Sequence, residues 1–297
     1  MESLRYVAVS LALGFLAVWA SENMFWFLPP PDLTVLGLLL TWLAYSVCAA
    51  AAVSAVLWSG SGGWPAAFLG GAILGYIVEG VVVATVYDNF PWQLAWTSLA
   101  WHGLLTGGVV LALGLSSLGP RARAWRWLLA GVGLGLWGVF WPLERQAEPD
   151  LALLLVYLAL PALGAILAFR AIRWAGRPTP PRWVLWVAPA LALALALFMA
   201  VAYPNPLRLI LPLILGGLYL TLRRSGPGAW PQPVPLSHDL PVLILPLAAI
   251  ATATALWITA GAFNTSLPLA VLTSVTGLLL LGRQVWRARG TVRPSAS

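Results

Sequence analysis

The chain has 297 residues, of which 61% are hydrophobic and only 8% are charged. A soluble domain carries roughly 25% charged residues, so a globule of this length could not cover its surface against water. The composition therefore excludes a soluble enzyme, a disordered chain and a nucleic-acid-binding domain. It predicts that the lipid bilayer surrounds most of the molecule.

All 16 basic residues are arginine, and they give a formal net charge of +7. Without lysine there is no Schiff base to retinal or pyridoxal phosphate and no P-loop lysine, so these cofactors are excluded. The single cysteine, Cys48, excludes an internal disulfide. The two histidines, His102 and His238, lie far apart, and the sequence contains no HExxH zinc motif.

Runs of about 20 apolar residues, the length that crosses a bilayer, recur along the chain. Turn-forming stretches rich in Pro, Gly, Asn and Asp separate them, for example at 29–32 and 59–63. We therefore predict an all-α polytopic bundle of about ten transmembrane helices at 6–28, 33–58, 65–87, 93–118, 124–143, 151–173, 183–203, 207–222, 240–262 and 269–288.

These helices are expected to form a single membrane domain over 1–297. Polar residues crowd the first four helices, within 6–118, whereas the six helices within 124–288 are mostly Leu, Ala and Val. Because polar groups inside a membrane usually mark function, the uneven pattern predicts that the functional site lies among the first four helices.

Arginine is distributed asymmetrically around the predicted helices. Fourteen of the 16 arginines flank the helix ends on the N-terminal side, and only Arg145 and Arg208 flank the opposite ends. By the positive-inside rule, both termini are expected in the cytoplasm. A signal-peptide cleavage site is conceivable near Ala20, but the apolar run resumes at Phe25, so we expect an uncleaved first helix.

Three ionisable residues lie inside predicted helices, namely Glu22, Glu79 and His102. At about 1.5 Å per residue, they lie roughly 9, 12 and 14 Å from the outer ends of the first, third and fourth helices. Helices of alternating direction thus place all three in one layer of the outer half of the membrane. The sequence predicts a polar site in this layer.

Residue spacing indicates which way these side chains face. Gly71, Gly75 and Glu79 recur every four residues, and a stripe of small residues lets helices approach closely. Glu79 is therefore expected to face a neighbouring helix. The fourth helix carries a polar stripe of the same spacing at Ser98, His102 and Thr106, and the second carries a weaker one at Thr41, Tyr45 and Cys48.

The candidate substrate- or proton-binding residues are Glu22, Asn23, Glu79, Asp88, Ser98 and His102. Asp88 lies in the short connection between the Glu79 and His102 helices and is expected to cap the site from outside. Two carboxylates and an imidazole in a layer of low dielectric could exchange protons near neutral pH. Alternatively, Glu22, Glu79 and His102 could hold a divalent metal with one position open for water. A third alternative is that Glu79 and His102 only hydrogen-bond each other across a helix pair and have no functional role.

Other polar residues have simpler interpretations. Six tryptophans fall in the outer half and are expected to form an aromatic belt or line a cavity: Trp26, Trp92, Trp96, Trp101, Trp137 and Trp141. Asp239 opens the ninth helix and is interpreted as its cap. Arg145 and Arg208 are expected to anchor the protein at the membrane surface.

We expect a small-molecule or ion permease of a bacterial or archaeal cytoplasmic membrane, surrounded by lipid and without a nucleic-acid partner. Its size and topology resemble the drug/metabolite transporter superfamily, but the internal duplication of that superfamily is not found. One alternative is an intramembrane enzyme, metal-dependent or not, acting on a lipid, prenyl or peptide substrate from the outer leaflet. A second is a non-catalytic membrane subunit.

Overall fold

The computed structural model describes residues 1–290, and its helices and turns contain no β-strand within that range. Ten helical stretches are long and apolar enough to cross a membrane. The prediction of an all-helical chain with ten such helices is therefore confirmed, and the boundaries differ from the predicted ones by a few residues. Arg293, one of the flanking arginines, lies outside the described residues.

Several of the ten stretches combine α-helix with π-helical or 3₁₀ turns. In chain order they are α1, η1 and α2 (Glu2–Val18, Trp19–Asn23, Met24–Trp26); α3 (Val35–Ser59); α4 and η2 (Gly63–Ile77, Val78–Val82); η4 and α5 (Leu94–Leu111, Ala112–Gly114); α6 and α7 (Pro120–Gly138, Trp141–Arg145); α8, η5 and α9 (Leu151–Leu154, Leu155–Ala159, Pro161–Ala175); α10 (Arg182–Ala202); η6 and α11 (Pro206–Leu209, Ile210–Arg224); η7, η8 and α12 (Leu236–His238, Leu240–Leu243, Ile244–Ala260); and α13 (Ser266–Gly290).

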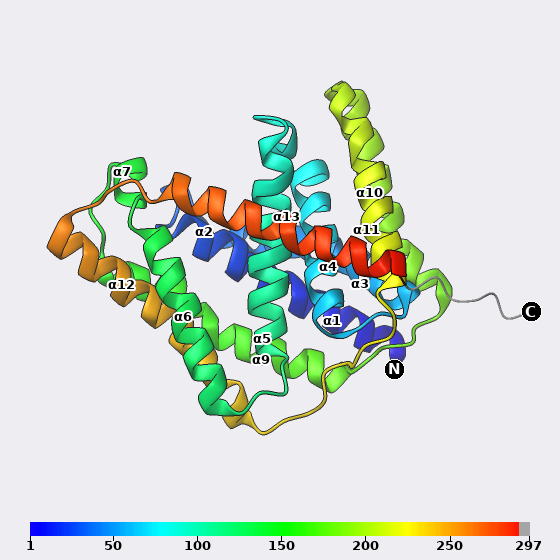
Figure 1. Ribbon diagram of the computed structural model, residues 1–297, viewed down its shortest axis with the longest axis horizontal. Helices are drawn as coiled ribbons and strands as arrows, with labels where there is room; N and C mark the ends of the chain where they lie inside the picture. The colour runs from blue at the N-terminus through cyan, green and yellow to red at the C-terminus, as the bar shows by residue number, and fades with distance from the viewer. Residues whose placement is uncertain (291–297) are drawn as a thin grey trace, which may run out of the picture.

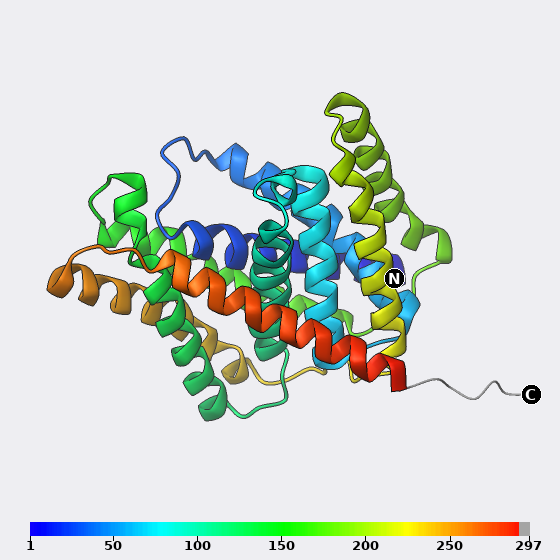
Figure 2. The same ribbon diagram turned by 45° about the horizontal axis from the view of Figure 1, so that its top comes forward.

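The helices surround a central pair formed by α4 and η4, and α13 crosses in front of η4 (Figure 1). Buried apolar side chains form two clusters. One joins α1, α3, α4, α10 and α11, and the other joins α1, η4, α6, α9 and α12. The α10–α11 hairpin stands away from the rest in both views (Figures 1 and 2), and only Val184, Leu185 and Ala188 of α10 are buried.

Two glycines bring α4 unusually close to η4. A Cβ atom at Gly75 would lie 2.5 Å from the His102 Cβ and 2.6 Å from the Ser98 carbonyl oxygen, and one at Gly71 would lie 2.7 Å from the His102 carbonyl oxygen. Only residues without a side chain allow this approach. The contact directs Glu79, one turn further along the same helix, toward η4.

Because this contact has no spare volume, Gly75→Ala is expected to destabilise the protein by about 1–3 kcal/mol. Thermal unfolding of the detergent-solubilised protein, followed by scanning fluorimetry, measures the effect. Gly133→Ala on α6 is the matched control, since a Cβ there meets nothing within 4 Å. Equal melting temperatures for the two variants would contradict the described packing.

Asp239 holds together three parts of the chain at the end of the bundle where α1 begins. The Arg173 guanidinium donates to its carboxylate, and Arg123 Nη1 lies 3.7 Å from the same oxygen. Arg123 is only 1% exposed and also donates to backbone carbonyls, including that of Ser116 at 2.9 Å. The interpretation of Asp239 as a helix cap was wrong, because its side chain makes no capping hydrogen bond and instead joins α6 and α9 to the start of the ninth stretch.

Candidate functional site

The three ionisable residues predicted to form a site all lie in π-helical segments. Glu22 lies in η1, Glu79 in η2 and His102 in η4, which runs for 18 residues. π-helical turns are rare and occur frequently at functional sites, since the widened turn redirects side chains that an α-helix would point elsewhere. All three ionisable residues therefore share this backbone feature, which also occurs at η5 without an ionisable residue of this set.

Glu79 and His102 are directly hydrogen-bonded to each other. His102 Nε2 lies 3.1 Å from Glu79 Oε1, and the two residues are 2% and 8% exposed. The other carboxylate oxygen accepts a hydrogen bond from the Thr85 hydroxyl. Thr85 reaches back to Glu79 because Ala84, just after η2, adopts a left-handed backbone conformation with φ 63° that reverses the chain.

Glu22 lies near this pair and is hydrogen-bonded to Tyr45 on α3. The Tyr45 hydroxyl donates to Glu22 Oε1, and Trp26 Nε1 donates to Oε2 at 3.0 Å. The Tyr45 ring centroid lies 6.0 Å from that of His102, and the Glu22 carboxylate is within electrostatic range of both His102 and Glu79. We call Glu22, Tyr45, His102, Glu79 and Thr85 the polar network.

The other predicted site residues have different surroundings. Asn23 is buried and donates to the Tyr157 carbonyl at 2.8 Å, which ties η1 to η5. Asp88 is exposed and makes no side-chain hydrogen bond or ion pair within residues 1–290, so it lies outside the polar network. Ser98 is fully buried on η4, one turn before His102.

The described residues contain no group of three His, Cys, Asp or Glu side chains placed to hold a metal ion. Glu22, Glu79 and His102 share a region, but all four carboxylate oxygens and His102 Nε2 already have hydrogen-bond partners, which are Tyr45, Trp26 and Thr85 together with the Glu79–His102 bond itself. The geometry therefore offers no support for the predicted three-ligand metal site, and the proposals below do not use a metal.

Buried polar atoms without a partner continue along η4 beside the polar network. Within residues 1–290, Ser98 Oγ, His102 Nδ1 and Thr106 Oγ1 have no hydrogen-bond partner, although the three residues are at most 7% exposed. Such groups cost free energy unless water or a ligand satisfies them. The polar stripe predicted on this helix is thus a row of unoccupied hydrogen-bonding positions.

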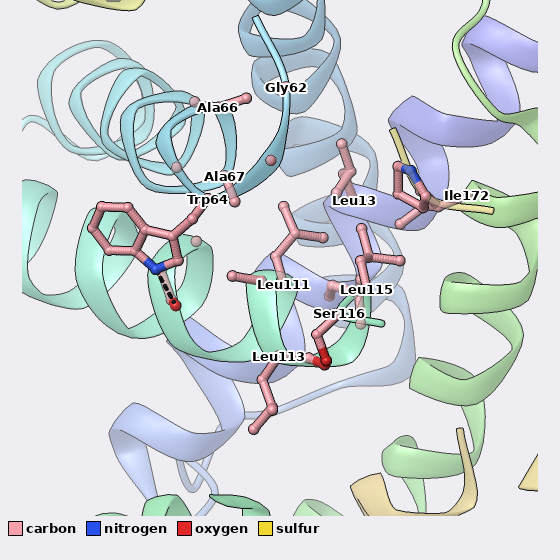
Figure 3. Close-up of a pocket in the computed structure, with 18 of the residues that line it drawn as sticks. Leu13, Gly62, Trp64, Ala66, Ala67, Leu111, Leu113, Leu115, Ser116 and Ile172 are labelled. Carbon is pink, nitrogen blue, oxygen red and sulfur yellow. Dashed lines mark hydrogen bonds between the residues drawn. The ribbon is translucent and has the colours of Figure 1, made fainter. Parts of the chain in front are cut away.

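A deep cavity of about 750 Å³ approaches the polar network from one end of the bundle. Its walls come mainly from α1, α3, α4 and η4, and its lining includes Trp64 on one side, Ile172 on the other, and Leu13 and Leu111 between them (Figure 3). It reaches the connections at 62–63, 115–118 and 229–234.

The cavity ends one helical turn from the polar network on each of its four walls. The cavity-lining residues nearest to Glu22, Tyr45, Glu79 and His102 along their helices are four or five residues away, and they are Ala17, Ala49, Leu74 and Thr106. Thr106 carries one of the unpartnered hydroxyls. The cavity therefore leads from the surface toward the polar network.

An aromatic cluster lies beyond the polar network, on the side away from the cavity. Neighbouring ring centroids in it are 4.8–6.2 Å apart, and its members are Phe25, Trp26, Trp96, Trp101, Trp137 and Trp141. Along α1 and η4 the order is cavity, polar network, aromatic cluster. Trp92, predicted in the same belt, is 37% exposed.

Arg145 and Arg208, the two arginines at this end, both rest on aromatic rings. The Arg145 guanidinium carbon lies 4.8 Å from the Trp26 ring centroid and 5.5 Å from that of Trp141, and Arg208 lies 4.9 Å from that of Tyr87. Within residues 1–290, no arginine forms an ion pair with Glu22 or Glu79.

Sequence reasoning did not assign Tyr45, Thr85 and Trp26 to the site. The polar stripe on the second helix contained Tyr45 and was a weak signal for it. Trp26 lies four residues after Glu22, a spacing at which helical side chains meet. Thr85 had no sequence signal, because its contact depends on the backbone conformation of Ala84.

No protein-family model, curated protein or solved structure matches this chain. The class of protein is therefore defined by the fold and the site alone. Within residues 1–290 it is an all-helical chain typical of integral membrane proteins, with ten membrane-length helices, a buried acid–imidazole network and an apolar cavity that ends one helical turn from that network.

Proposed function

We propose that this protein is a membrane permease that moves a small molecule or ion through the cavity and couples the movement to a proton on the polar network. The observation that carries the proposal is the order of cavity, polar network and aromatic cluster along the same helices. A pathway open at one end and closed by packed rings at the other is what one state of a transporter requires.

The polar network has the groups needed to hold and release a proton inside the membrane. Two carboxylates and one imidazole lie within electrostatic range of each other, and the Tyr45 hydroxyl donates to one of the carboxylates, Glu22. A buried carboxylate without a cationic partner is costly in its ionised form. Proton uptake therefore changes the charge of this layer and gives a reason for the helices around it to rearrange.

The direction of the cavity follows from the arginine distribution. Within residues 1–290, 13 of 15 arginines flank the end of the bundle at which the chain begins, and the positive-inside rule assigns that end to the cytoplasm. We infer that both chain ends are cytoplasmic and that the cavity opens to the cytoplasm. The aromatic cluster then faces the outside of the cell.

A permease must expose the polar network to both sides in turn, whereas a scaffold or a one-sided enzyme exposes it to one. In a Cys48→Ala background, Ala49→Cys at the inner end of the cavity is therefore expected to react with a membrane-impermeant methanethiosulfonate from either side. The measurement compares labelling rates in inside-out and right-side-out membrane vesicles.

Ser117→Cys, at the exposed rim of the cavity, is the matched control. It is expected to react from the cavity side only, because its position does not depend on which gate is open. Labelling of Ala49→Cys from the cavity side alone, at both acidic and alkaline pH, would contradict alternating access and with it the proposed function.

A further inference from the structure

We propose that the cargo is a protonated amine with an apolar body, which exchanges for a proton at the carboxylates of Glu22 and Glu79. This inference rests on the proposed function and names the substrate class of the same site. It is drawn from the charge of the polar network, the vacant hydrogen-bonding atoms on η4 and the lining of the cavity.

The charge of the site calls for a cation. Two carboxylates and one imidazole face each other, and no arginine within residues 1–290 pairs with either acid. The remaining titratable groups near Glu22 are the Tyr45 and Tyr157 hydroxyls, and Arg145, which lies near Tyr157, is stacked on Trp26. A cationic head group would offset the cost of the ionised carboxylates in a layer of low dielectric.

The vacant atoms favour a ligand that donates hydrogen bonds. An ionised carboxylate can only accept, so beside an ionised Glu79 the proton of a neutral His102 lies on Nε2, and Nδ1 is then an acceptor. The Ser98 and Thr106 hydroxyl oxygens also accept, and all three atoms lack a partner in the described chain. An ammonium group carries N–H donors that match these acceptors, whereas a quaternary ammonium carries none.

The cavity suits an apolar body attached to that head group. Its volume of about 750 Å³ is in the range of pockets that hold drug-sized molecules, roughly 300–1,000 Å³. Its walls are mainly aliphatic, and Trp64, stacked on Phe68 at 5.0 Å, adds an aromatic surface. The one arginine among its lining residues, Arg126, is exposed at the rim and favours an anion instead, which the test below includes.

The exchange balances in charge and atoms. One ammonium cation enters the polar network, and one proton passes from a carboxyl group to water or buffer in the cavity, so that one O–H bond breaks and the proton bonds to its new acceptor. The layer therefore carries the same net charge before and after exchange, and the two cations compete for the same carboxylates. This competition couples the movement of the amine to the movement of the proton.

Isothermal titration of the purified full-length protein in lipid nanodiscs tests the ligand class with three probes of similar size. We expect 2-phenylethylamine to bind and to release about one proton, measured from the dependence of the heat on buffer ionisation. Its N,N,N-trimethyl analogue, which lacks N–H donors, is expected to bind at least about tenfold more weakly. The anion 3-phenylpropanoate is expected not to bind.

Three results would overturn the proposal: binding of the anion as tight as that of the amine, equal affinity of the quaternary analogue, or amine binding without proton release. Glu79→Gln and Thr106→Val are each expected to weaken amine binding at least about tenfold. Asp88→Asn makes the same chemical change as Glu79→Gln at an exposed position, and it is expected to leave affinity unchanged.

Failure of this inference is distinguishable from failure of the proposed function. Two-sided labelling of Ala49→Cys without amine binding would overturn the substrate class and leave the permease intact. Amine binding with proton release, combined with one-sided labelling, would uphold the binding site and overturn transport.

Discussion

Glu79→Gln is expected to lower the labelling rate of Ala49→Cys from the side opposite the cavity at least about tenfold, while the protein stays folded. The amide keeps the size of the side chain but cannot gain or lose a proton. Position 79 then stays in one charge state, and the change of charge that is proposed to rearrange the surrounding helices no longer occurs there. His102→Ala removes the hydrogen-bond partner at 3.1 Å and is expected to have the same effect.

This prediction needs a control for folding and a control variant outside the polar network. Size-exclusion chromatography and melting temperature show whether each variant is folded, and Asp88→Asn, exposed and outside the polar network, is expected to label at the wild-type rate. If Ala49→Cys is labelled from both sides at wild-type rates in the Glu79→Gln and His102→Ala variants, the polar network does not control access between the two sides of the membrane. The proposed functional site would then be wrong.

Asp239→Ala is expected to cause the largest loss of stability, about 3–5 kcal/mol, since removing one partner of a buried ion pair leaves the other charge uncompensated. Arg123 and Arg173 are 1% and 3% exposed and cannot turn toward water without disrupting α6 and α9. Scanning fluorimetry is expected to show a melting temperature lower by roughly 10 °C.

Asp88→Ala removes an acidic residue from an exposed loop and is the control, with no expected change in melting temperature. A double variant, Asp239→Ala with Arg173→Met, is expected to recover part of the loss, because it removes one of the unpaired charges together with the carboxylate. If Asp239→Ala alone were as stable as the wild type, the side chains of Asp239, Arg123 and Arg173 would be solvated and would contribute nothing to the free energy of unfolding.

The ten helices were predictable because apolar length is a direct physical requirement of the bilayer. From residue counts along the helices we expected Glu22, Glu79 and His102 in one layer. In the structure Glu79 and His102 are hydrogen-bonded to each other, and Glu22 lies within electrostatic range of both. The glycine spacing likewise indicated which face of α4 meets η4.

The remaining features depend on three-dimensional packing that a linear pattern does not encode. The π-helical turns change the helical register without a distinctive sequence, and the role of Thr85 depends on the φ angle of one alanine. Asp239 at a helix start has the sequence signature of a cap, and only the arrangement of α6 and α9 reveals its arginine partners. The cavity is the volume left between four helices and has no sequence signal at all.

The glycine contact between α4 and η4 limits how this protein can diversify. A larger side chain at Gly75 would displace the His102 imidazole, and one at Gly71 would collide with the His102 backbone carbonyl. Variants adapted to bulkier cargo are therefore expected to carry their substitutions on the facing walls, at positions such as Leu13 on α1 and Val53 on α3. Directed evolution for altered selectivity would best randomise those walls and leave the glycine contact unchanged.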